Sequence, residues 1–392
     1  MSASADGGET APRTGPLAGL TVLEMAGIGP VPLAGLMLAE MGARVVRIER
    51  TGTGKPLLPV PDEFSLDRHG REVLRIDLKG PEGVELLLRL AEGADVLLEG
   101  FRPGVMERLG LGPEAALARN PRLVYGRMTG FGQDGPLGPR AGHDLTYLAL
   151  TGVLHAIGER DRKPVPPLNL VADYGGGTMF LITGVLAALI ERGVSGKGQV
   201  VDAAMVDGAS MLAAPFFGFL ASGFWRDRRG SNLLDSGAPF YDTYECSDGR
   251  HVAVACLEPQ FFAEFARLLP LDQKLASAQY DPSLWPAMRE AIALRIAQRS
   301  RDDWAALFET TDACVAPVLS LAEAPDHPHA LGRESHVMAG RLRRPAPAPR
   351  FSRTRSQTAS PETPAIGPRR VLTGFGIASE EADALASAGI AG

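Results

Sequence analysis

Hydrophobic and polar positions follow one another along the first half of the chain in the order of a parallel α/β sheet. Residues 20–25 form an apolar run typical of a buried strand, residues 31–41 repeat apolar positions with helical spacing, and residues 44–49 form a second strand-like run. Strand, helix and strand in this order open a parallel sheet. The same pattern predicts further strands at residues 73–78, 95–99, 123–128 and 200–203, and helices at residues 81–92, 144–149, 176–192 and 205–224.

The pattern changes near residue 230. Residues 240–246 and 251–257 alternate between apolar and polar positions around a Ser-Asp-Gly-Arg turn, which predicts a β-hairpin. Three helices are predicted after it, at residues 259–269, 285–299 and 302–310. This part of the chain is therefore predicted to be a smaller α+β domain. Residues 345–368 are rich in proline and predict an extended linker or strap, and residues 379–388 predict a last helix.

The length and composition of the chain narrow the possible functions. A chain of 392 residues is longer than one ordinary hydrophobic core requires, so two domains are expected. Hydrophobic residues make up 45% of the chain and charged residues 22%, as in globular proteins in general. The formal net charge of −6 argues against nucleic-acid binding, although a few placed arginines could still hold a small anionic ligand.

Three features bear on where the protein resides. The three cysteines, Cys246, Cys256 and Cys314, are not spaced as metal ligands, and their small number favours a reducing compartment. Residues 1–15 are small and polar without a secretory signal pattern, and we expect them to form a disordered tail. The longest apolar run, residues 179–190, is too short to span a bilayer. These features predict a cytoplasmic protein that does not enter the membrane.

Two glycine-marked turns carry residues that could exchange protons. Gly142-His143-Asp144-Leu145 precedes one predicted helix, and residues 171–177, Val-Ala-Asp-Tyr-Gly-Gly-Gly, precede another. A histidine and an aspartate of different basicity on two sides of a carbon could remove its proton and return one. A backbone N–H at a helix start could also receive a developing negative oxygen. Structural alternatives stay open, because Asp144 and Asp173 could each simply cap the following helix.

Other motifs near the predicted strand ends are weaker signals. Gly27-Ile28-Gly29 begins a dinucleotide-binding fingerprint, but its third glycine position holds Pro32, so that turn geometry is the favoured interpretation. Arg50, Arg102 and Arg108 follow or lie near strand ends, where guanidinium groups could bind phosphates. Taken alone, these arginines are interpreted as solvated surface charges.

The chain carries an ordered set of short motifs from about residue 16 to the last helix. They include Leu-Glu-Met-Ala-Gly-Ile-Gly-Pro (23–30), Val-Val-Arg-Ile-Glu-Arg (45–50), Glu-Gly-Phe-Arg-Pro-Gly-Val (99–105), Arg-Met-Thr-Gly-Phe-Gly-Gln (127–133), Gly-His-Asp (142–144), Leu-Asn-Leu-Val-Ala-Asp-Tyr-Gly-Gly-Gly (168–177) and Glu-Pro-Gln-Phe-Phe (258–262). In this order they resemble the α-methylacyl-CoA racemases, a group within the CaiB/BaiF (family III) coenzyme A-transferase superfamily.

The resemblance implies an interlocked homodimer of the α/β class. A large Rossmann-like domain at residues 16–205 would bind coenzyme A, and residues 206–232 would form a linker helix. Residues 233–330 would form the small α+β domain, and residues 331–392 would return along a strap and pack the C-terminal helix on the large domain. The active site would lie between the large domain of one subunit and the small domain of the other.

The resemblance also implies roles for individual residues. His143, supported by Glu258, would be one acid/base and Asp173 the other, while the N–H of Asp144 would bind the thioester oxygen. Taken alone, Glu258 reads as a first-turn acid of a helix with Pro259 at its first position. The coenzyme A-binding residues would be Arg50, Ile76, Asp77, Leu78, Lys79, Gly100, Phe101, Arg102, Arg108, Gly142, His143, Asp144, Leu145, Thr146 and Tyr147. The reaction would need no metal and no cofactor beyond the coenzyme A of its acyl-CoA substrate.

The nearest alternative lies in the same superfamily. In the coenzyme A-transferases, the aspartate that corresponds to Asp173 attacks the thioester and carries the acyl group as an anhydride. These transferases generally lack a histidine corresponding to His143 and tend to carry a glycine-rich loop in place of Leu257-Glu258-Pro259, so both positions favour the racemase. A non-catalytic coenzyme A-binding protein has no use for the histidine and the aspartate together. Residues 205–225, rich in Met, Phe and Leu, could line an acyl surface, although a core or dimer interface is favoured.

Overall fold

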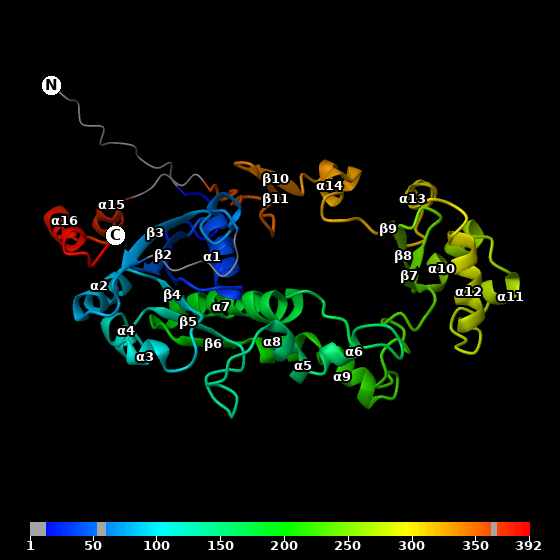
Figure 1. Ribbon diagram of the computed structural model, residues 1–392, viewed down its shortest axis with the longest axis horizontal. Coiled ribbons are helices and arrows are strands. Elements are labelled where there is room, and N and C mark those ends of the chain that lie inside the picture. Colours follow the sequence, from blue (N-terminus) through cyan, green and yellow to red (C-terminus); the bar gives the residue numbers. More distant parts are fainter. Residues whose placement is uncertain (1–12, 53–59, 362–366) are drawn as a thin grey trace, which may run out of the picture. The chain divides into compact units, whose positions relative to one another are not determined.

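The computed structural model describes residues 13–52, 60–361 and 367–392 (Figure 1). The chain forms two compact units, each with its own hydrophobic core. In its described parts, the first unit takes in Met1–Tyr147, Asn169–Leu212 and Gly332–Gly392, and the second takes in Leu148–Leu168 and Ala213–Leu331. Most of the tail predicted at residues 1–15 lies outside the described residues.

A parallel sheet of six strands forms the centre of the first unit. Its strands are β1 Thr21–Met25, β2 Arg44–Arg50, β3 Arg71–Ile76, β4 Val96–Glu99, β5 Val124–Thr129 and β6 Val200–Ala204. They lie in the order β3-β2-β1-β4-β5-β6, and every neighbouring pair is parallel. The predicted α/β fold is confirmed. The strand order reverses between β1 and β4, and the carboxyl ends at such a reversal are where sheets of this kind bind ligands.

Helices pack on both faces of this sheet. The helices of the unit are α1 Pro30–Glu40, α2 Pro81–Glu92, α3 Val105–Arg108, α4 Pro113–Arg119, α7 Met179–Ser195, α8 Met205–Leu212, α15 Pro368–Thr373 and α16 Ser379–Ser387, and α5 Asp144–Leu150 begins in it. Buried side chains of α2, α15 and α16 pack with Leu23 and Tyr125 on one face. Because side chains alternate along a strand, Glu24 and Gly126 face the other side, where α1 and α7 approach them.

A charged cluster is buried beneath α1. Glu24 on β1 is 0% exposed and pairs with Arg47 on β2 (Nη1 to Oε1, 2.6 Å) and with Arg71 on β3 (Nε to Oε2, 3.1 Å). A Cβ at Gly35 of α1 would lie 1.9 Å from Oε2 of Glu24, so a side chain here would push the helix away. A buried ion pair survives when hydrogen bonds complete it, and this cluster fixes how α1 lies on the sheet.

The second unit contains residues 233–330, for which a small α+β domain was expected, together with residues 148–168 and 213–232. An antiparallel sheet joins β7 Tyr241–Glu245, β8 His251–Ala255 and β9 Val315–Pro317. The helices of this unit include α6 Val153–Ala156, α9 Ala214–Ala221, α10 Pro259–Leu268, α11 Gln273–Ala276, α12 Trp285–Ile296, α13 Arg301–Phe308 and α14 Pro328–Gly332. Aromatic side chains, among them Phe240, Phe262 and Trp304, fill its core. The hairpin and three of its helices agree with the hydrophobic pattern, whereas the three-residue strand β9 was not predicted.

Two predicted helices differ from the structure. The apolar run predicted as one helix at residues 205–224 is two helices, α8 and α9, which break ahead of Pro215. The helix predicted from residue 176 begins at Met179, and the residues before it form a π-helix, η2, over Leu170–Thr178. The division into units also places residues 148–168 in the second unit, whereas the sequence suggested that they belong to the large domain.

The continuous helical stretch Leu170–Ser195 is, within the described residues, the one stretch long and apolar enough to cross a membrane. Length and composition alone do not separate a core helix from a membrane span. Leu181 and Val185 of α7 are buried and lie close to Gly126 of β5, as the side chains of a core helix do. This stretch therefore has a structural reason to be apolar inside a folded unit.

The predicted strap runs along the first unit. It begins after a hairpin of β10 His336–Ala339 and β11 Leu342–Pro345, which the sequence did not predict. The buried side chain of Arg344 pairs with Glu40 at the end of α1. Glu40 also accepts the Ala359 N–H (3.2 Å), and its carbonyl accepts the Gln357 N–H (2.9 Å). These contacts attach the proline-rich segment to the helix that follows β1.

Candidate active site

His143 occupies the position just before the first turn of α5. Its carbonyl accepts the N–H of Thr146 (2.8 Å) and of Tyr147 (3.2 Å), and its own N–H donates to Thr146 Oγ1 (3.0 Å). The residue that caps α5 is therefore His143, through its backbone, and the interpretation of Asp144 as the cap is wrong. The imidazole is exposed and available to a substrate.

Asp144 ties this turn to the second candidate turn. Its side chain is 6% exposed, and Oδ2 accepts the N–H groups of Ala172 (2.9 Å) and Asp173 (2.8 Å). Within the described residues the backbone N–H of Asp144 makes no hydrogen bond, so this donor is free for an oxygen of a ligand. One residue thus supplies a free N–H beside His143 and holds the backbone of Asp173.

Asp173 lies in the π-helix η2 rather than at a helix cap. Thr178 precedes α7 at its N-cap, and the Asp173 carboxylate instead accepts a hydrogen bond from Asn169 Nδ2 (3.1 Å). The interpretation of Asp173 as a helix cap is therefore wrong. Asn169 is a site residue that the sequence analysis missed, although its spacing of four residues from Asp173 was a usable signal on a helix. π-Helical turns often occur at functional sites.

The carboxylate of Asp173 faces the glycine turn that follows β1. Gly29 has a left-handed backbone (φ +72°), and a Cβ there would lie 3.4 Å from Asp173 Oδ2. The Gly27-Ile28-Gly29 motif, interpreted as turn geometry, therefore lies beside the candidate acid/base. This position is at the carboxyl end of β1, next to the reversal of strand order.

The environment of Asp173 favours its protonated form. Burial raises the pKa of the Asp173 carboxyl above its ordinary value, and the negative charge of Asp144 raises it further. The hydrogen bond from Asn169 and the nearby His143 act in the opposite direction. A carboxyl group with a raised pKa can serve as an acid as well as a base near neutral pH.

Two of the three glycines that follow Asp173 have a packing role. Gly176 and Gly177 are buried, and a Cβ on Gly176 would lie 2.5 Å from the Ala209 backbone nitrogen of α8. A Cβ on Gly208 would lie 1.9 Å from the Gly176 carbonyl oxygen. These glycines let η2 and α8 approach backbone to backbone.

The predicted phosphate-binding residues gather at the carboxyl ends of the strands. Arg50 ends β2, Lys79 follows β3, Arg102 follows β4, and Arg108 lies in α3. Within residues 13–52, 60–361 and 367–392, the side chains of these four residues make no ion pair. Four unpaired cations at the ligand-binding edge of a parallel sheet suit an anionic ligand better than the interpretation of scattered surface charges.

A buried network holds the loop that carries Arg102. Glu99, which is 0% exposed, pairs with Arg127 of β5 (2.9 Å) and accepts the Phe101 N–H (2.7 Å). Arg127 also pairs with Glu107 of α3 (2.7 Å). Burial raises the pKa of Glu99 above its ordinary value, against the hydrogen bonds from Phe101 and Arg127. The loop Gly100-Phe101-Arg102 is therefore fixed by β4, β5 and α3 together.

Some of the predicted coenzyme A-binding residues also have structural roles. Ile76 and Leu78 belong to the hydrophobic core, and the Asp77 N–H donates to the carbonyl of Ile390 (3.0 Å) near the C-terminus. Among these four consecutive residues, Asp77 and Lys79 have the more accessible side chains. Because the Ile76 and Leu78 side chains are buried, these two residues would contact coenzyme A through their backbone, and their binding role stays a prediction.

Tyr147 connects the two halves of the candidate site. Its ring is buried and packs edge-on against Phe131, with ring centroids 4.9 Å apart. Burial raises the pKa of Tyr147, the charge of Asp173 raises it further, and Arg102 lowers it. The Tyr147 phenol therefore interacts electrostatically with both the candidate acid/base, Asp173, and a candidate phosphate ligand, Arg102. Gly142, Leu145 and Thr146 precede Tyr147 in the chain, and Leu145 and Thr146 are exposed.

Glu258 belongs to the second unit, where it precedes α10. Its carbonyl accepts the Phe262 N–H (3.0 Å), but its side chain makes no capping hydrogen bond. The carbonyl of Leu257, the residue before Glu258, accepts hydrogen bonds from Gln279 Nε2 (2.8 Å) and from the Tyr280 hydroxyl. The pKa of the Tyr280 phenol is raised, first by burial and second by the negative charge of the nearby Glu258 carboxylate. The Glu258 side chain itself is exposed. Its support of His143 stays a prediction.

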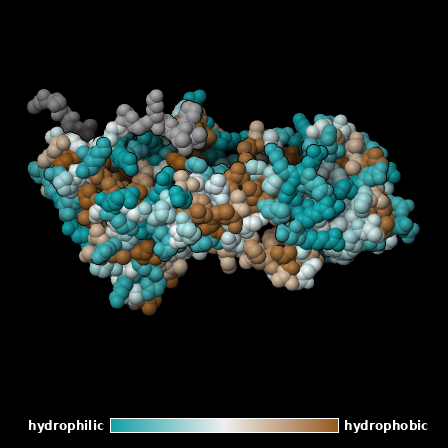
Figure 2. Space-filling view, turned by 60° about the horizontal axis from the view of Figure 1, so that its bottom comes forward, coloured by the Kyte–Doolittle hydropathy of each residue, from teal (hydrophilic) through white to brown (hydrophobic). Residues whose placement is uncertain are grey.

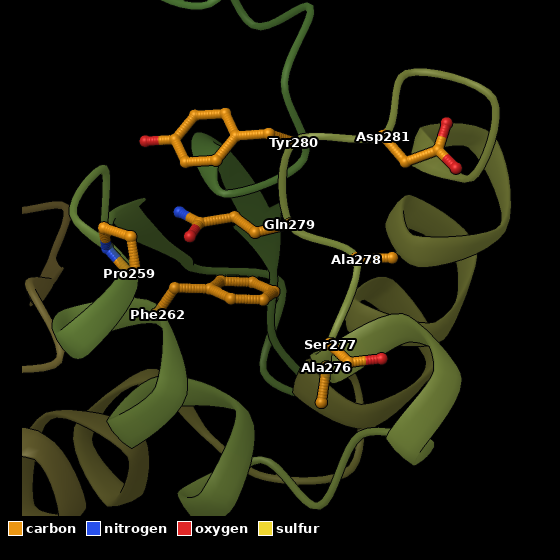
Figure 3. A pocket seen from close by; sticks show the side chains of 8 residues that line it. All are labelled: Pro259, Phe262, Ala276, Ser277, Ala278, Gln279, Tyr280 and Asp281. Atoms are coloured by element: carbon orange, nitrogen blue, oxygen red, sulfur yellow. The ribbon is translucent and has the colours of Figure 1, made fainter.

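A pocket of about 400 Å³ adjoins this residue within the second unit. Figure 3 shows Pro259, Phe262, Gln279 and Tyr280 around it, and residues 276–278 and Asp281 complete the lining. The lining combines apolar side chains with the polar groups of Ser277, Gln279 and Asp281. Across the described ranges of the chain, no group of three or more His, Cys, Asp or Glu side chains could hold a metal ion.

Comparison with known proteins places these observations in a family. The sequence matches CoA-transferase family III over residues 17–370. It is 43% identical over 369 residues to an α-methylacyl-CoA racemase of Mus musculus, covering 93% of this chain and 94% of the relative. It is 40% identical over 370 residues to an α-methylacyl-CoA racemase of Homo sapiens, with the same coverage of 93% and 94%. A crystal structure of a CaiB/BaiF family protein from Brucella suis, 28% identical, superimposes with a TM-score of 0.76 over 89% of this chain and 96% of that one.

Proposed function

The chain belongs to CoA-transferase family III, and from this premise we propose that it is a racemase that interconverts the (R) and (S) forms of 2-methylacyl-CoA thioesters. The observation that carries the proposal is the hydrogen bonding of Asp144 between the turn of His143 and the backbone of Asp173. The Asp144 carboxylate accepts the backbone N–H of Asp173, and the residue itself follows His143, so that Asp144 connects the two residues that we propose as proton carriers. The similarity to racemases over 93% of the chain supports the same assignment.

The chemistry requires a proton to leave one face of the α carbon and another to arrive on the opposite face. For one enantiomer of the substrate, His143 would remove the proton and Asp173 would supply one. For the other enantiomer the two roles would exchange. The free N–H of Asp144 would donate to the thioester oxygen as the enolate forms, since donors aimed at developing charge stabilise such an intermediate. The raised pKa of Asp173 supports its part as an acid.

The unpaired cations support a coenzyme A thioester as the substrate. Arg50, Arg102 and Arg108 would bind the 3′-phosphate ADP, because guanidinium groups bind phosphate oxygens in pairs. Pantetheine would then run along Gly100-Phe101 and the turn from Gly142 toward His143. In this proposal coenzyme A is part of the substrate, and proton transfer at the α carbon requires no further cofactor.

Exposed apolar surface supports a homodimer with an active site shared between subunits. None of the residues of α9 is buried, and Phe216, Phe217 and Leu220 are large exposed side chains on it. Figure 2 shows hydrophobic patches on the drawn face of the molecule. Contiguous apolar surface of this kind usually marks an interaction site. In the proposed dimer, Glu258 of one subunit would reach His143 of the other, in a cytoplasmic enzyme.

Coenzyme A transfer is the second candidate function. The partly exposed carboxylate of Asp173 next to Gly29 is placed where it could attack a thioester carbonyl and hold the acyl group as an anhydride. Transfer does not use the imidazole of His143, so the two functions make different demands on the same site. A protein that only binds coenzyme A would require neither side chain.

Substitution of the two proton carriers tests the proposal. We expect His143→Ala and Asp173→Ala each to abolish interconversion of the two enantiomers, and to abolish α-proton exchange in the enantiomer whose proton the lost side chain removes, while coenzyme A thioester binding persists. Arg295→Ala, an exposed arginine of α12, serves as the control and should exchange at the wild-type rate. Wild-type interconversion of the enantiomers in either site variant would overturn the proton-transfer assignment. Acyl transfer that survives His143→Ala would favour the transferase.

A further inference from the structure

Asp144 carries a feature that the proposed chemistry leaves unused. Its Oδ2 atom accepts two backbone N–H groups, from Ala172 and Asp173, at 2.9 and 2.8 Å. Its other oxygen, Oδ1, is buried and has no hydrogen-bond donor among the described residues. An unpartnered buried polar atom destabilises a fold, so that its presence here calls for an explanation.

We propose that the Asp144 carboxylate is a positioning residue for Asp173, which fixes the backbone that carries Asp173 and holds a negative charge beside it; this inference rests on the proposed function. The two hydrogen bonds set where the Asp173 Cα lies. The uncompensated oxygen keeps the Asp144 charge effective at short range, because few dipoles screen a buried group. The same residue would thereby place the oxyanion donor and one proton carrier in a fixed relation.

Other titratable and charged groups lie on Asp173's own element and on the elements around it. They are Tyr174 in η2, His143 just before α5, Tyr147 in α5, Arg102 after β4, Glu40 on α1, Glu191 and Arg192 on α7, Asp202 on β6 and Asp207 on α8. Glu40 lies at the far end of α1, paired with Arg344. Through their charges His143 lowers the pKa of Asp173 and Asp144 raises it. Asp144 is therefore the anion that opposes ionisation of Asp173.

Two substitutions separate position from charge. Asp144→Asn keeps one amide oxygen that can accept both N–H groups and removes the negative charge. Asp144→Ala removes both. Asp207→Asn removes an exposed charge from α8, which packs against η2, and is the matched control.

Two readouts test the inference. The first is the pH profile of α-proton exchange in a 2-methylacyl-CoA, and the second is a ¹³C NMR titration of the Asp173 carboxyl, identified by its loss in Asp173→Asn. We expect Asp144→Asn to move both the acid limb of the profile and the NMR titration of Asp173 to lower pH. We expect Asp144→Ala to slow exchange about 10²-fold, because misplacing a reacting group by about 1 Å has that effect. Asp207→Asn should match the wild type in both readouts.

The inference would be overturned if the NMR titration of Asp173 and the pH profile of exchange in Asp144→Asn both superimposed on those of the wild type. This is the result expected if the Asp144 side chain is merely structural. If the wild-type protein does not exchange the α proton at all, the proposed function fails. The NMR titration of the free protein needs no turnover, and it would still decide whether Asp144 acts on Asp173.

Discussion

The packing of η2 against α8 makes a sharp prediction for Gly208. A Cβ at this position would lie 1.9 Å from the Gly176 carbonyl oxygen and 2.6 Å from its carbonyl carbon, and both are backbone atoms that cannot rotate away. Overpacking costs about 3 kcal/mol at the upper end of its usual range, and alanine in a helix regains about 1 kcal/mol over glycine. Gly208→Ala should therefore destabilise the first unit by about 2 kcal/mol, the difference of these figures.

The same substitution should also reach the active site. Gly176 lies three residues after Asp173, so that a displacement of η2 by about 1 Å would slow α-proton exchange about 10²-fold. Thermal unfolding should show a midpoint lowered by about 4 °C or more. Gly193→Ala is the matched control, because Gly193 is an exposed residue of α7 where a Cβ would meet no atom within 4 Å. That variant should gain about 1 kcal/mol. A Gly208→Ala protein as stable and as active as the wild type would refute the packing described for η2.

Two further predictions concern ligand affinity and pH dependence. Arg102→Ala should raise the Kd for coenzyme A about tenfold in calorimetric titration, because one hydrogen-bonded contact to a charged group contributes about 1.5 kcal/mol. Arg295→Ala should leave this Kd unchanged, and equal losses in both variants would contradict the assignment of Arg102. Asn169→Ala removes a hydrogen bond that lowers the pKa of Asp173, so the acid limb of the exchange profile should move to higher pH. A limb that moves to lower pH would contradict this account.

The sheet could be predicted from the sequence because its elements depend on local pattern. The strand-like runs at residues 20–25 and 44–49 became β1 and β2 with their ends within one residue of the prediction. A strand buried on both faces is apolar along most of its length, as residues 20–25 are, and residues 44–49 keep apolar side chains at Val45, Val46 and Ile48 between charged ones. The hairpin of β10 and β11 was missed because its strands are short and include exposed polar residues such as Arg343.

The sequence could name the residues of the candidate site, whereas their geometry depends on contacts that a sequence does not show. His143, Asp144 and Asp173 were identified beforehand, but the π-helix that carries Asp173 depends on long-range contacts. It requires the Asp144 carboxylate, 29 residues away, and the close approach of Gly208 on another helix. The interpretation of Asp144 and Asp173 as helix caps was wrong because their carboxylates have other partners. Asp144 accepts the N–H groups of Ala172 and Asp173, and Asp173 accepts a hydrogen bond from the Asn169 side chain. The hydrogen-bonding role of Asn169 had a local signal that the sequence analysis did not use.

The arginines proposed to bind phosphate show what sequence cannot supply. Considered one at a time, Arg50, Arg102 and Arg108 look like surface charges, because exposed arginines are common. The sheet brings them to one edge, and the Glu99–Arg127 pair fixes the loop between two of them. Their significance therefore comes from topology.

Incubation of the wild-type protein with one enantiomer of a 2-methylacyl-CoA in heavy water tests the central claim most directly. The account predicts deuterium at C2 together with conversion to the other enantiomer, as read by mass spectrometry and chiral analysis of the acyl group. Transfer of the acyl-CoA's coenzyme A to a free carboxylic acid, with no deuterium at C2, would contradict it and assign Asp173 to acyl transfer.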